Sequence, residues 1–548
     1  MKHLFSVILL LCLATAGSAQ NILYAPVLGG ATDTSVRILF FTAAPVSFRM
    51  EVARDSSFGG AEIYTASTDS RLHNRGLVDV HGLTPDTRYY YRVVIDGRPD
   101  TRQGSFTTWP AEGTRRHYTI TTGSCQETDD MKAYDVMARH KPDVFIHTGD
   151  WTYPDYMVPG YPTTEEFIFK GYEKRYTEKS MKEMLPYTLI DYVADNHDGT
   201  GMGIHEHLRA ARYREDSAKG IVNYFDIDSD LCKWRSNVIQ GYMHYYPGYP
   251  LADTSHGIYH SFRMGNAEFF VLDTRQDAEL NVRGFHYDST ANHWTFAPGP
   301  QHKIISDAQM QWLKNGLKTS TADWKFIVMG VPFNKNARHL INLGIHYQDL
   351  ELADQGTGFR LASSWSCYWA GYPASQEDLL GFIRDNNIKD VLVISGDTHH
   401  NVMDDGRNAG LPEINASGLS VTGTVLAHYM NLIGVISGYP NIKKYLWNGG
   451  GNGIHNKNYK NAFGQIDING RESVRMSFVD EDDHVICALD IPHSSTITKE
   501  KKQRKPLYLK RVERISFAKK PTPGIRFIKA MARTLLHKKK IKTNGDLT

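Results

Sequence analysis

The stretch DVFIHTGD, residues 143–150, is an apolar run that closes on a glycine and a carboxylate. Other apolar runs also end on polar residues: HYTITTGSC (117–125), AEFFVLDTR (267–275), WKFIVMGVPFN (324–334) and VLVISGDTHH (391–400). Helical patterns at 308–317 and 376–383 alternate with them, which indicates an α/β domain. Because the carboxyl ends of strands in open α/β sheets face the ligand crevice, these polar ends are expected to build one site.

Two of the polar segments carry oxygen ligands and an imidazole. Asp150, in GDWTY, can bridge two cations through its two carboxylate oxygens, and Tyr153 can supply a phenolate to one of them. Asn196, in ADNHD, offers a neutral amide oxygen. The adjacent His197 is then available to hydrogen-bond a phosphate oxygen or to protonate a leaving group.

A third segment, SGDTHH, adds a carboxylate at Asp397 and an imidazole at His399. Together with GDWTY and ADNHD, it makes a ligand set suited to two metals. A site with thiolate, phenolate and imidazole suits iron or zinc, whereas a site with only oxygen donors suits calcium, magnesium or manganese. The sequence therefore predicts two metal sites of different character.

The order GSC, GDWTY, ADNHD, LDTRQ and SGDTHH resembles that of the PhoD-like alkaline phosphatases, within the calcineurin-like metallophosphoesterases. The segments KGYEKRYTEKSMKEMLPYTLIDYVADNHD and IYHSFRMGNAEFFVLDTRQ extend this resemblance over roughly residues 117–490. It implies an αββα sandwich with the site at one edge. It further implies an iron-like ion, or zinc, held by Cys125, Asp150, Tyr153 and His399, and an oxygen-ligated ion such as calcium, magnesium or manganese held by Asp150, Asn196 and Asp397.

The same resemblance assigns the catalytic residues. Arg275 would clamp phosphate and His197 would assist the leaving oxygen, while a hydroxide activated by the metals attacks phosphorus. A lone cysteine is more often an inert buried thiol, but the place of Cys125 in the GSC motif favours a metal ligand. Around these residues we expect a supporting group that consists of Asp195, Asp273, Asn334 and His400.

The supporting group carries separate expectations. Asp273 would orient nearby groups, and Asn334 falls where many superfamily members place a histidine ligand. His400 either packs locally, as expected for His140 and His147, or reaches substrate. Aromatic residues at the spacing of Trp365, Tyr368, Trp369 and Tyr372 are more often core than pocket lining.

One motif departs from the family pattern. The family commonly shows Asp-Asp-His-Glu where this chain has Asp-Asn-His-Asp at 195–198. Asparagine at the second place is common in the wider superfamily. The site is therefore expected to survive with an altered metal preference.

The chain divides into four expected parts. Residues 1–19 have the charged start, short apolar run and small residues of a secretory signal peptide, which predicts export to the periplasm or the extracellular space. Residues 20–112 contain short strands separated by turns and resemble a fibronectin type III-like or immunoglobulin-like β-sandwich. Residues 113–492 form the metallophosphatase domain, and residues 493–548 form a basic tail.

The tail is the most strongly charged part of the chain. Residues 499–548 carry 17 Lys and Arg against three Asp and Glu, whereas the whole chain of 548 residues has a net charge of +2. The tail is either a basic amphipathic helix or a solvated extension, and it would contact an anionic membrane or envelope surface. No nucleic-acid-binding module is expected. The cysteines are too few for a disulfide framework, and the pairing of Cys232, Cys367 and Cys487 stays open.

The leading functional hypothesis is an exported phosphomonoesterase or phosphodiesterase with a two-metal centre. One alternative is a phospholipase-like enzyme or a phosphodiesterase that acts on cell-wall polymers. The other is a non-catalytic envelope-binding protein in which the metal site is vestigial. An assay of the metal-loaded protein on one monoester and one diester separates the three.

Overall fold

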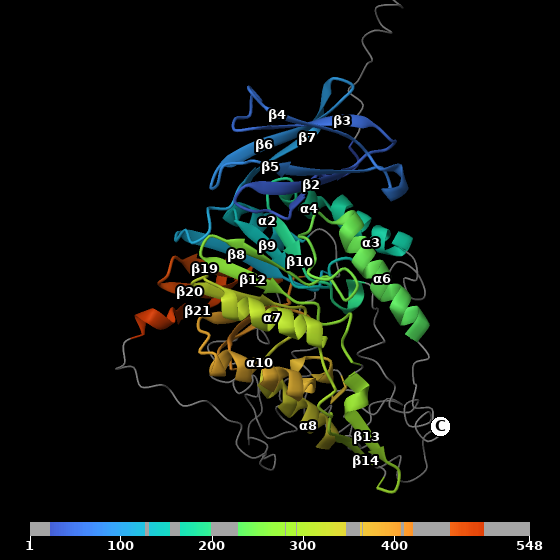
Figure 1. Ribbon diagram of the computed structural model, residues 1–548, viewed down its shortest axis with the longest axis vertical. Coiled ribbons are helices and arrows are strands. Elements are labelled where there is room, and N and C mark those ends of the chain that lie inside the picture. The colour runs from blue at the N-terminus through green and yellow to red at the C-terminus, as the bar shows by residue number, and fades with distance from the viewer. Residues whose placement is uncertain are drawn as a thin grey trace, which may run out of the picture.

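The computed structural model describes residues 22–126, 131–153, 165–198, 228–279, 281–291, 293–346, 362–363, 365–399, 401–406, 410–419 and 461–497. The expected signal peptide and nearly all of the basic tail lie outside these residues. The described chain forms an all-β unit at one end and a larger α/β unit beneath it (Figure 1). Among the helices described, none is long and apolar enough to cross a bilayer.

The N-terminal unit consists of two antiparallel sheets. One contains β1 (Val27–Gly29), β2 (Ser35–Phe41) and β5 (Arg75–His81), and the other contains β4 (Glu62–Ser67), β3 (Ser47–Ala53), β6 (Arg88–Ile95) and β7 (Arg98–Thr107) in spatial order. Asp96 and Gly97 join β6 to β7 with φ of 51° and 75°, the left-handed pair that a tight hairpin turn requires. The expected all-β region is thus confirmed, while its kinship with fibronectin domains stays a prediction.

The α/β unit contains two six-stranded sheets. The first sheet has the order β10 (Ile190–Tyr192), β9 (Val144–His147), β8 (His117–Gly123), β19 (Ala462–Asn469), β20 (Ser473–Asp480), β21 (Val485–Pro492). The second has the order β11 (His260–Met264), β12 (Ala267–Val271), β15 (Trp324–Val328), β16 (Val391–Ser395), β18 (Pro412–Ala416), β17 (Asn401–Asp405). Strands β8, β9 and β10 are parallel, as are β12, β15, β16 and β18. Every residue of β9, β15 and β16 is buried, which explains their uninterrupted apolar sequences.

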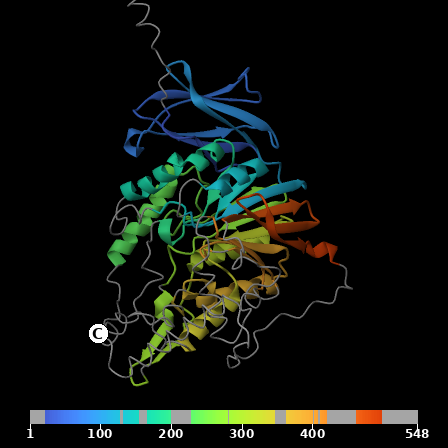
Figure 2. The ribbon, with the colours of Figure 1, turned by 180° about the vertical axis from the view of Figure 1, so that it is seen from behind.

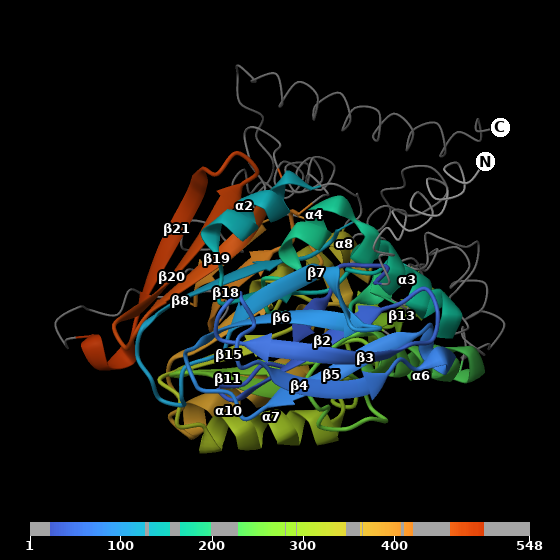
Figure 3. The same ribbon diagram turned by 90° about the horizontal axis from the view of Figure 1, so that it is seen from above.

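Helices cover the outer face of each sheet (Figure 3). Those packed on the first sheet are α2 (Lys132–His140), α3 (Glu165–Thr177), α4 (Lys179–Met184) and α6 (Asp228–Tyr245). Those on the second sheet are α7 (Asp307–Thr319), α8 (Arg338–His346) and α10 (Pro373–Asp385), and a small hairpin of β13 (Phe285–Asp288) and β14 (His293–Phe296) lies next to α8. A third hydrophobic cluster fills the space between the two sheets. This arrangement is the αββα sandwich that the sequence predicts.

The two units share one interface. The cluster between the sheets continues into the N-terminal sandwich, and Leu28 forms a parallel bridge with Leu189, beside β10. The His73 ring stacks on Phe169 of α3 with centroids 3.6 Å apart, and the Tyr91 hydroxyl donates to the Pro186 carbonyl at 3.2 Å. Seen from behind, the sandwich sits on the end of the α/β unit nearest α3 and α4 (Figure 2). The expected boundary at residue 112 falls between β7 and β8 and stays a prediction.

Candidate metal centre

The polar residues expected at the strand ends follow strands of both sheets. The first sheet carries the segments after β8, β9 and β10, and the second carries the segments after β12, β15 and β16. In this order the segments supply Cys125; Asp150 and Tyr153; Asp195, Asn196 and His197; Asp273 and Arg275; Asn334; and Asp397 and His399. All of them except His399 are fully buried, and His399 is partly exposed. His400 lies outside the described residues.

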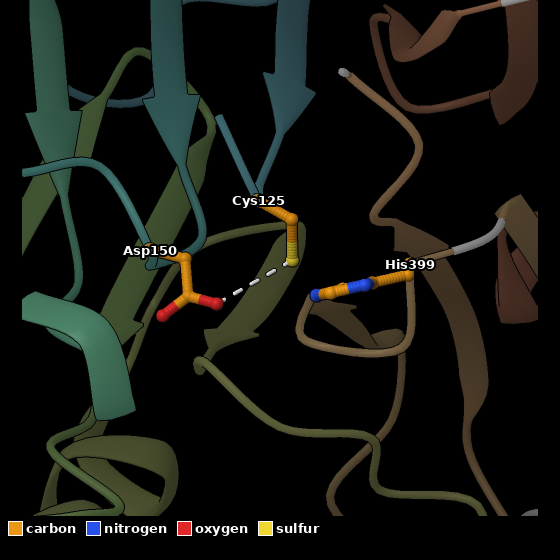
Figure 4. A group of neighbouring side chains, drawn as sticks. All are labelled: Cys125, Asp150 and His399. Atoms are coloured by element: carbon orange, nitrogen blue, oxygen red, sulfur yellow. Dashed lines mark hydrogen bonds between the residues drawn. The ribbon is translucent and has the colours of Figure 1, made fainter. Parts of the chain in front are cut away.

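A first group of possible ligand atoms comes from Cys125, Asp150 and His399, and these atoms all lie within 4.8 Å of one another. Figure 4 shows the three side chains converging from three separate loops. The Cys125 Sγ lies 3.7 Å from Asp150 Oδ2, and the Tyr153 hydroxyl lies 3.4 Å from the same oxygen. Sulfur, imidazole, carboxylate and phenol therefore surround one point, a donor set that fits iron or zinc.

A second group combines Asp150, Asp195 and Asp397, again with ligand atoms within 4.8 Å of one another. Asp150 belongs to both groups. Asp195, which was expected to support the ligands, contributes a carboxylate to this group, and its role stays a prediction. Asn196 is buried in the short 3-10 helix η3 (Asn196–Asp198), directly after Asp195. This oxygen-rich group fits a hard cation.

The buried acids repel one another unless a cation balances them. Burial raises the pKa of Asp150 well above its usual range, and the carboxylates of Asp195 and Asp397 contribute to that rise. Burial likewise raises the pKa of Asp195 to about 7, although the Arg275 charge opposes this. A metal ion between these oxygens would favour the ionised carboxylates. The residues present thus fit a cation at this place.

The two softer donors respond to the same environment. Burial, then the charges of Asp150 and Asp397, raises the pKa of the Cys125 thiol well above its ordinary value. Burial lowers the pKa of His399 to about 4, which keeps its imidazole neutral and able to ligate. Cys125 would become a thiolate only when a cation binds beside it.

Arg275 lies against the second group of acids. Its buried guanidinium forms an ion pair through Nε with Asp195, and its Nη2 donates to Asp397 Oδ2 at 2.7 Å. A cationic side chain therefore lies directly against the carboxylates of Asp195 and Asp397.

His197 contacts both Asp150 and Tyr153. Its backbone N–H donates to Asp150 Oδ1 at 3.0 Å, and its ring stacks on Tyr153 with centroids 4.5 Å apart. The stack holds the imidazole next to Tyr153 of the first ligand group.

The backbone at the site is unusual. Cys125, Asp150, Tyr153, Asp397 and His399 all have positive φ, with values of 63°, 57°, 44°, 70° and 55°. Residues other than glycine rarely adopt this left-handed region, and such conformations gather at functional sites. The surrounding structure must hold these five residues against their local preference.

Asp198 is the residue that holds the first-sheet loops, and the sequence analysis did not assign it this role. Its carboxylate accepts hydrogen bonds from the N–H groups of Asp150, Trp151 and Thr152 at 2.7, 2.9 and 2.7 Å. It also accepts the N–H of Asp195 at 2.8 Å, which ties the ADNHD segment to the GDWTY segment. The only available signal was its position in ADNHD.

Arg175 is a second missed residue. Its buried guanidinium donates to the carbonyl oxygens of Trp151 and Gln126, and its Nη1 lies 3.1 Å from Glu178. Gln126 directly follows Cys125, so one side chain joins the loops that carry Cys125 and Asp150. Its sequence signal was the family-like segment KGYEKRYTEK.

The second-sheet loops have separate supports. Asp273 accepts the N–H groups of Ile258, Arg275 and Gln276 at 3.0, 3.0 and 2.9 Å, which agrees with an orienting role. Asn334 follows Phe333, whose N–H donates to Glu413 at 2.8 Å, and its role as a ligand stays a prediction.

The remaining candidates pack away from the ligand groups. His140 bonds to Gln465 and Asp483, and His147 is buried against Trp151. The four aromatic residues between 365 and 372 belong to the hydrophobic cluster under the second sheet, which agrees with the core interpretation.

Comparison with known proteins agrees with this geometry. The family model described as PhoD-like phosphatase matches residues 213–425. The curated protein "Alkaline phosphatase D" of Bacillus subtilis (strain 168) is 27% identical over 390 residues, or 65% of this chain. The chain is therefore similar to the PhoD-like phosphatases over residues 213–425. It spans 58% of the length of that relative.

Solved structures support the fold of this PhoD-like chain. A structure titled "Structure of PhoD" covers 96% of this chain and 99% of its own, with a TM-score of 0.61 and 18% identity. A purple acid phosphatase from yellow lupin (Lupinus luteus) seeds covers 86% of this chain and 74% of its own, with a TM-score of 0.51 and 11% identity. At these identities the likeness concerns the fold, and it confirms the αββα sandwich.

Proposed function

We propose that this PhoD-like chain is a metal-dependent phosphoester hydrolase that acts as an exported alkaline phosphatase or phosphodiesterase. The observation that carries the proposal is the pair of ligand groups that share Asp150, with Arg275 against the second group. Similarity to a phosphatase family supports the same reaction class.

The protein's own residues would divide the work around a bound phosphoester. Two metal ions would supply Lewis acidity and an activated water nucleophile. Arg275 would stabilise negative charge on the phosphoryl oxygens, because its guanidinium is buried where such charge is strongly favoured. His197, held by its stack on Tyr153, would donate a proton to the leaving oxygen.

The two ions are proposed to differ. Cys125, Asp150, Tyr153 and His399 would hold iron or zinc, since this set contains sulfur and imidazole. Asp150, Asn196 and Asp397, with Asp195 beside them, would hold calcium, magnesium or manganese. The first test is metal analysis of the purified protein, together with turnover of one monoester and one diester. Absence of both metals and of turnover would contradict the proposal.

Replacement of Cys125 by serine tests the asymmetry of the two ions. Cys125→Ser keeps the size of the side chain but removes the soft donor, so the iron-like ion should be lost while the oxygen-ligated ion is largely retained. Cys367→Ser is the matched control, because Cys367 is also buried but belongs to the core under the second sheet. Unchanged metal content and activity in Cys125→Ser would contradict the assignment of Cys125 as a ligand.

Export and surface contact are proposed from the two ends of the chain, which lie outside the described residues. Removal of residues 499–548 should preserve turnover of small soluble esters and weaken binding to anionic vesicles, more so at low salt. Equal vesicle binding with and without the tail would contradict a surface role. Fractionation of cells that express the full chain tests export.

A further inference from the structure

Ser417 lies beside the first ligand group although it belongs to no motif used above. It directly follows β18, which pairs in parallel with β16 so that Ile394 is opposite Ile414 and Ser395 is opposite Asn415. The two strands therefore emerge side by side at the same edge of the sheet. Ser417 is fully buried there.

The hydrogen bonds of Ser417 define the direction of its hydroxyl proton. The backbone N–H of His399 donates to Ser417 Oγ at 2.9 Å. An amide N–H can only donate, so Ser417 Oγ is the acceptor in this bond. The Ser417 hydroxyl proton is therefore not used here and can be donated to another atom. The Cys125 Sγ lies 2.9 Å from the same Oγ.

The protonation state of Cys125 decides which atom donates in this contact. A thiol could donate its proton to Ser417 or to Asp150, whose Oδ2 lies 3.7 Å from Sγ. A thiolate has no proton. Once a metal has displaced the thiol proton of Cys125, Ser417 must therefore be the donor. The order of donors would then run from the His399 amide to the Ser417 hydroxyl to the sulfur.

We propose that Ser417 is a positioning residue that donates a hydrogen bond to the Cys125 thiolate and thereby tunes the sulfur as a metal ligand. The inference rests on the metal site of the proposed function but not on turnover. A hydrogen bond to a ligating sulfur withdraws charge from it, and groups that contact ligands in this way adjust metal retention and redox potential. The same hydroxyl also fixes the backbone of His399, so Ser417 couples two ligands of one ion.

Ser124 provides an internal comparison. Its hydroxyl is also buried, but Oγ lies 3.5 Å from Cys125 Sγ, and it has the Ala416 carbonyl as acceptor at 3.4 Å. Its proton therefore has another acceptor, and its contact with sulfur is longer. Removal of this hydroxyl should disturb the sulfur less than removal of that of Ser417.

The test uses the full chain loaded with Co²⁺, whose charge-transfer band with thiolate reports on the sulfur directly. In Ser417→Ala the band should move to lower energy, and Co²⁺ should pass to a chelator about 10- to 100-fold faster. Ser124→Ala should show a smaller change in both, and Ser417→Thr, which keeps a hydroxyl, should resemble wild type in the band. Ser417→Gly replaces the alanine variant if that variant does not fold by circular dichroism.

Three outcomes would overturn the role of Ser417. A folded Ser417→Ala with the wild-type band would show that no hydrogen bond reaches the thiolate. A folded variant that binds no Co²⁺ would make Ser417 essential to the site rather than a tuning residue. A wild-type protein without a thiolate band would remove Cys125 as a ligand. None of these readouts uses phosphatase turnover, so an inactive wild type with a shifted band in Ser417→Ala would contradict only the proposed function.

Discussion

The loops of the first sheet and those of the second sheet are held in different ways. In the first sheet a single carboxylate, Asp198, receives N–H groups from both the Asp150 loop and the Asp195 loop. In the second sheet, Asp273 ties the Arg275 segment to Ile258, while Glu413 accepts from Phe333 and from Ser395 at 2.8 and 2.6 Å. The Asp150 and Asp195 loops of the first sheet are therefore held together by one residue, whereas the loops of the second sheet have separate supports.

This difference has a functional consequence. Loss of the residue that holds the first-sheet loops should affect both ligand groups, because both contain Asp150. Loss of one supporting residue in the second sheet should affect only the loop that this residue holds. Substitutions in the two sheets test this contrast.

The largest effect is expected for Asp150→Asn. The shared carboxylate would be lost from both ligand groups, so both ions should leave. Metal ions supply several kcal/mol of transition-state stabilisation, and each 1.4 kcal/mol is tenfold in rate, so turnover should fall by about 1000-fold or more. Metal analysis and steady-state kinetics measure this. Asp323→Asn, a change before the start of β15 and hence at the opposite end of that strand, is the control that should keep both ions.

A matched pair, Asp198→Asn and Asp273→Asn, separates the two sheets. Each change should lower activity by about 10- to 100-fold, the usual result of losing a partner that orients site residues. Asp198→Asn should also reduce the content of both metals, because both first-sheet loops lose a common acceptor. Asp273→Asn should lower the rate through Arg275 while metal content stays near wild type. Loss of metal in Asp273→Asn with full metal in Asp198→Asn would reverse the contrast.

The smallest effect concerns the seam between the sheets. His260 of β11 and Asp191 of β10 form a buried pair with Nε2 and Oδ2 3.1 Å apart. Burial disfavours the imidazolium, but the Asp191 carboxylate outweighs it and raises the pKa of His260 above its usual 6.5. The charged pair therefore stabilises the fold fully below about pH 6.5, and this contribution is lost as pH rises through the folded pKa.

His260→Gln should flatten this part of the pH dependence. The difference in unfolding free energy between pH 6 and pH 8 should therefore shrink. Urea unfolding at the two pH values measures it. His81→Gln, which changes an exposed histidine at the end of β5, is the control. An unchanged pH dependence in His260→Gln would mean that the pair does not titrate in this range.

The sequence predicted the strands of the α/β unit well because their apolar runs are continuous. Strands β9, β15 and β16 are buried on both faces, and such strands leave an unmistakable pattern that ends where the polar segment begins. The polar residues could be proposed as ligands for a second reason. Carboxylate, imidazole, phenol and thiol groups that share strand ends have few structural roles that would need all four. The Asp-Gly turn between β6 and β7 is similarly local in origin.

The support of the site could not be predicted in the same way. Asp195 and Asp198 are three positions apart in one short motif, yet one lies among the possible ligand atoms and the other accepts backbone N–H groups. The different contacts of Asp195 and Asp198 depend on the left-handed backbone of Asp150 and on the close approach of the two loops. A side chain's partners among residues distant in sequence leave no periodic signal.

What the sequence by itself determined is the chemistry available to the protein: apolar strands, their polar ends and the kinds of donor that these ends carry. Those properties follow from local burial patterns and from side-chain type. The tertiary structure alone decided that Asp150 is shared between two ligand groups, that Asp198 and Arg175 hold its loop, and that Ser417, 292 residues from Cys125 along the chain, lies within hydrogen-bonding distance of its sulfur. The reason is that the packing of two sheets against each other, rather than any local pattern, sets the distances between residues far apart in the sequence.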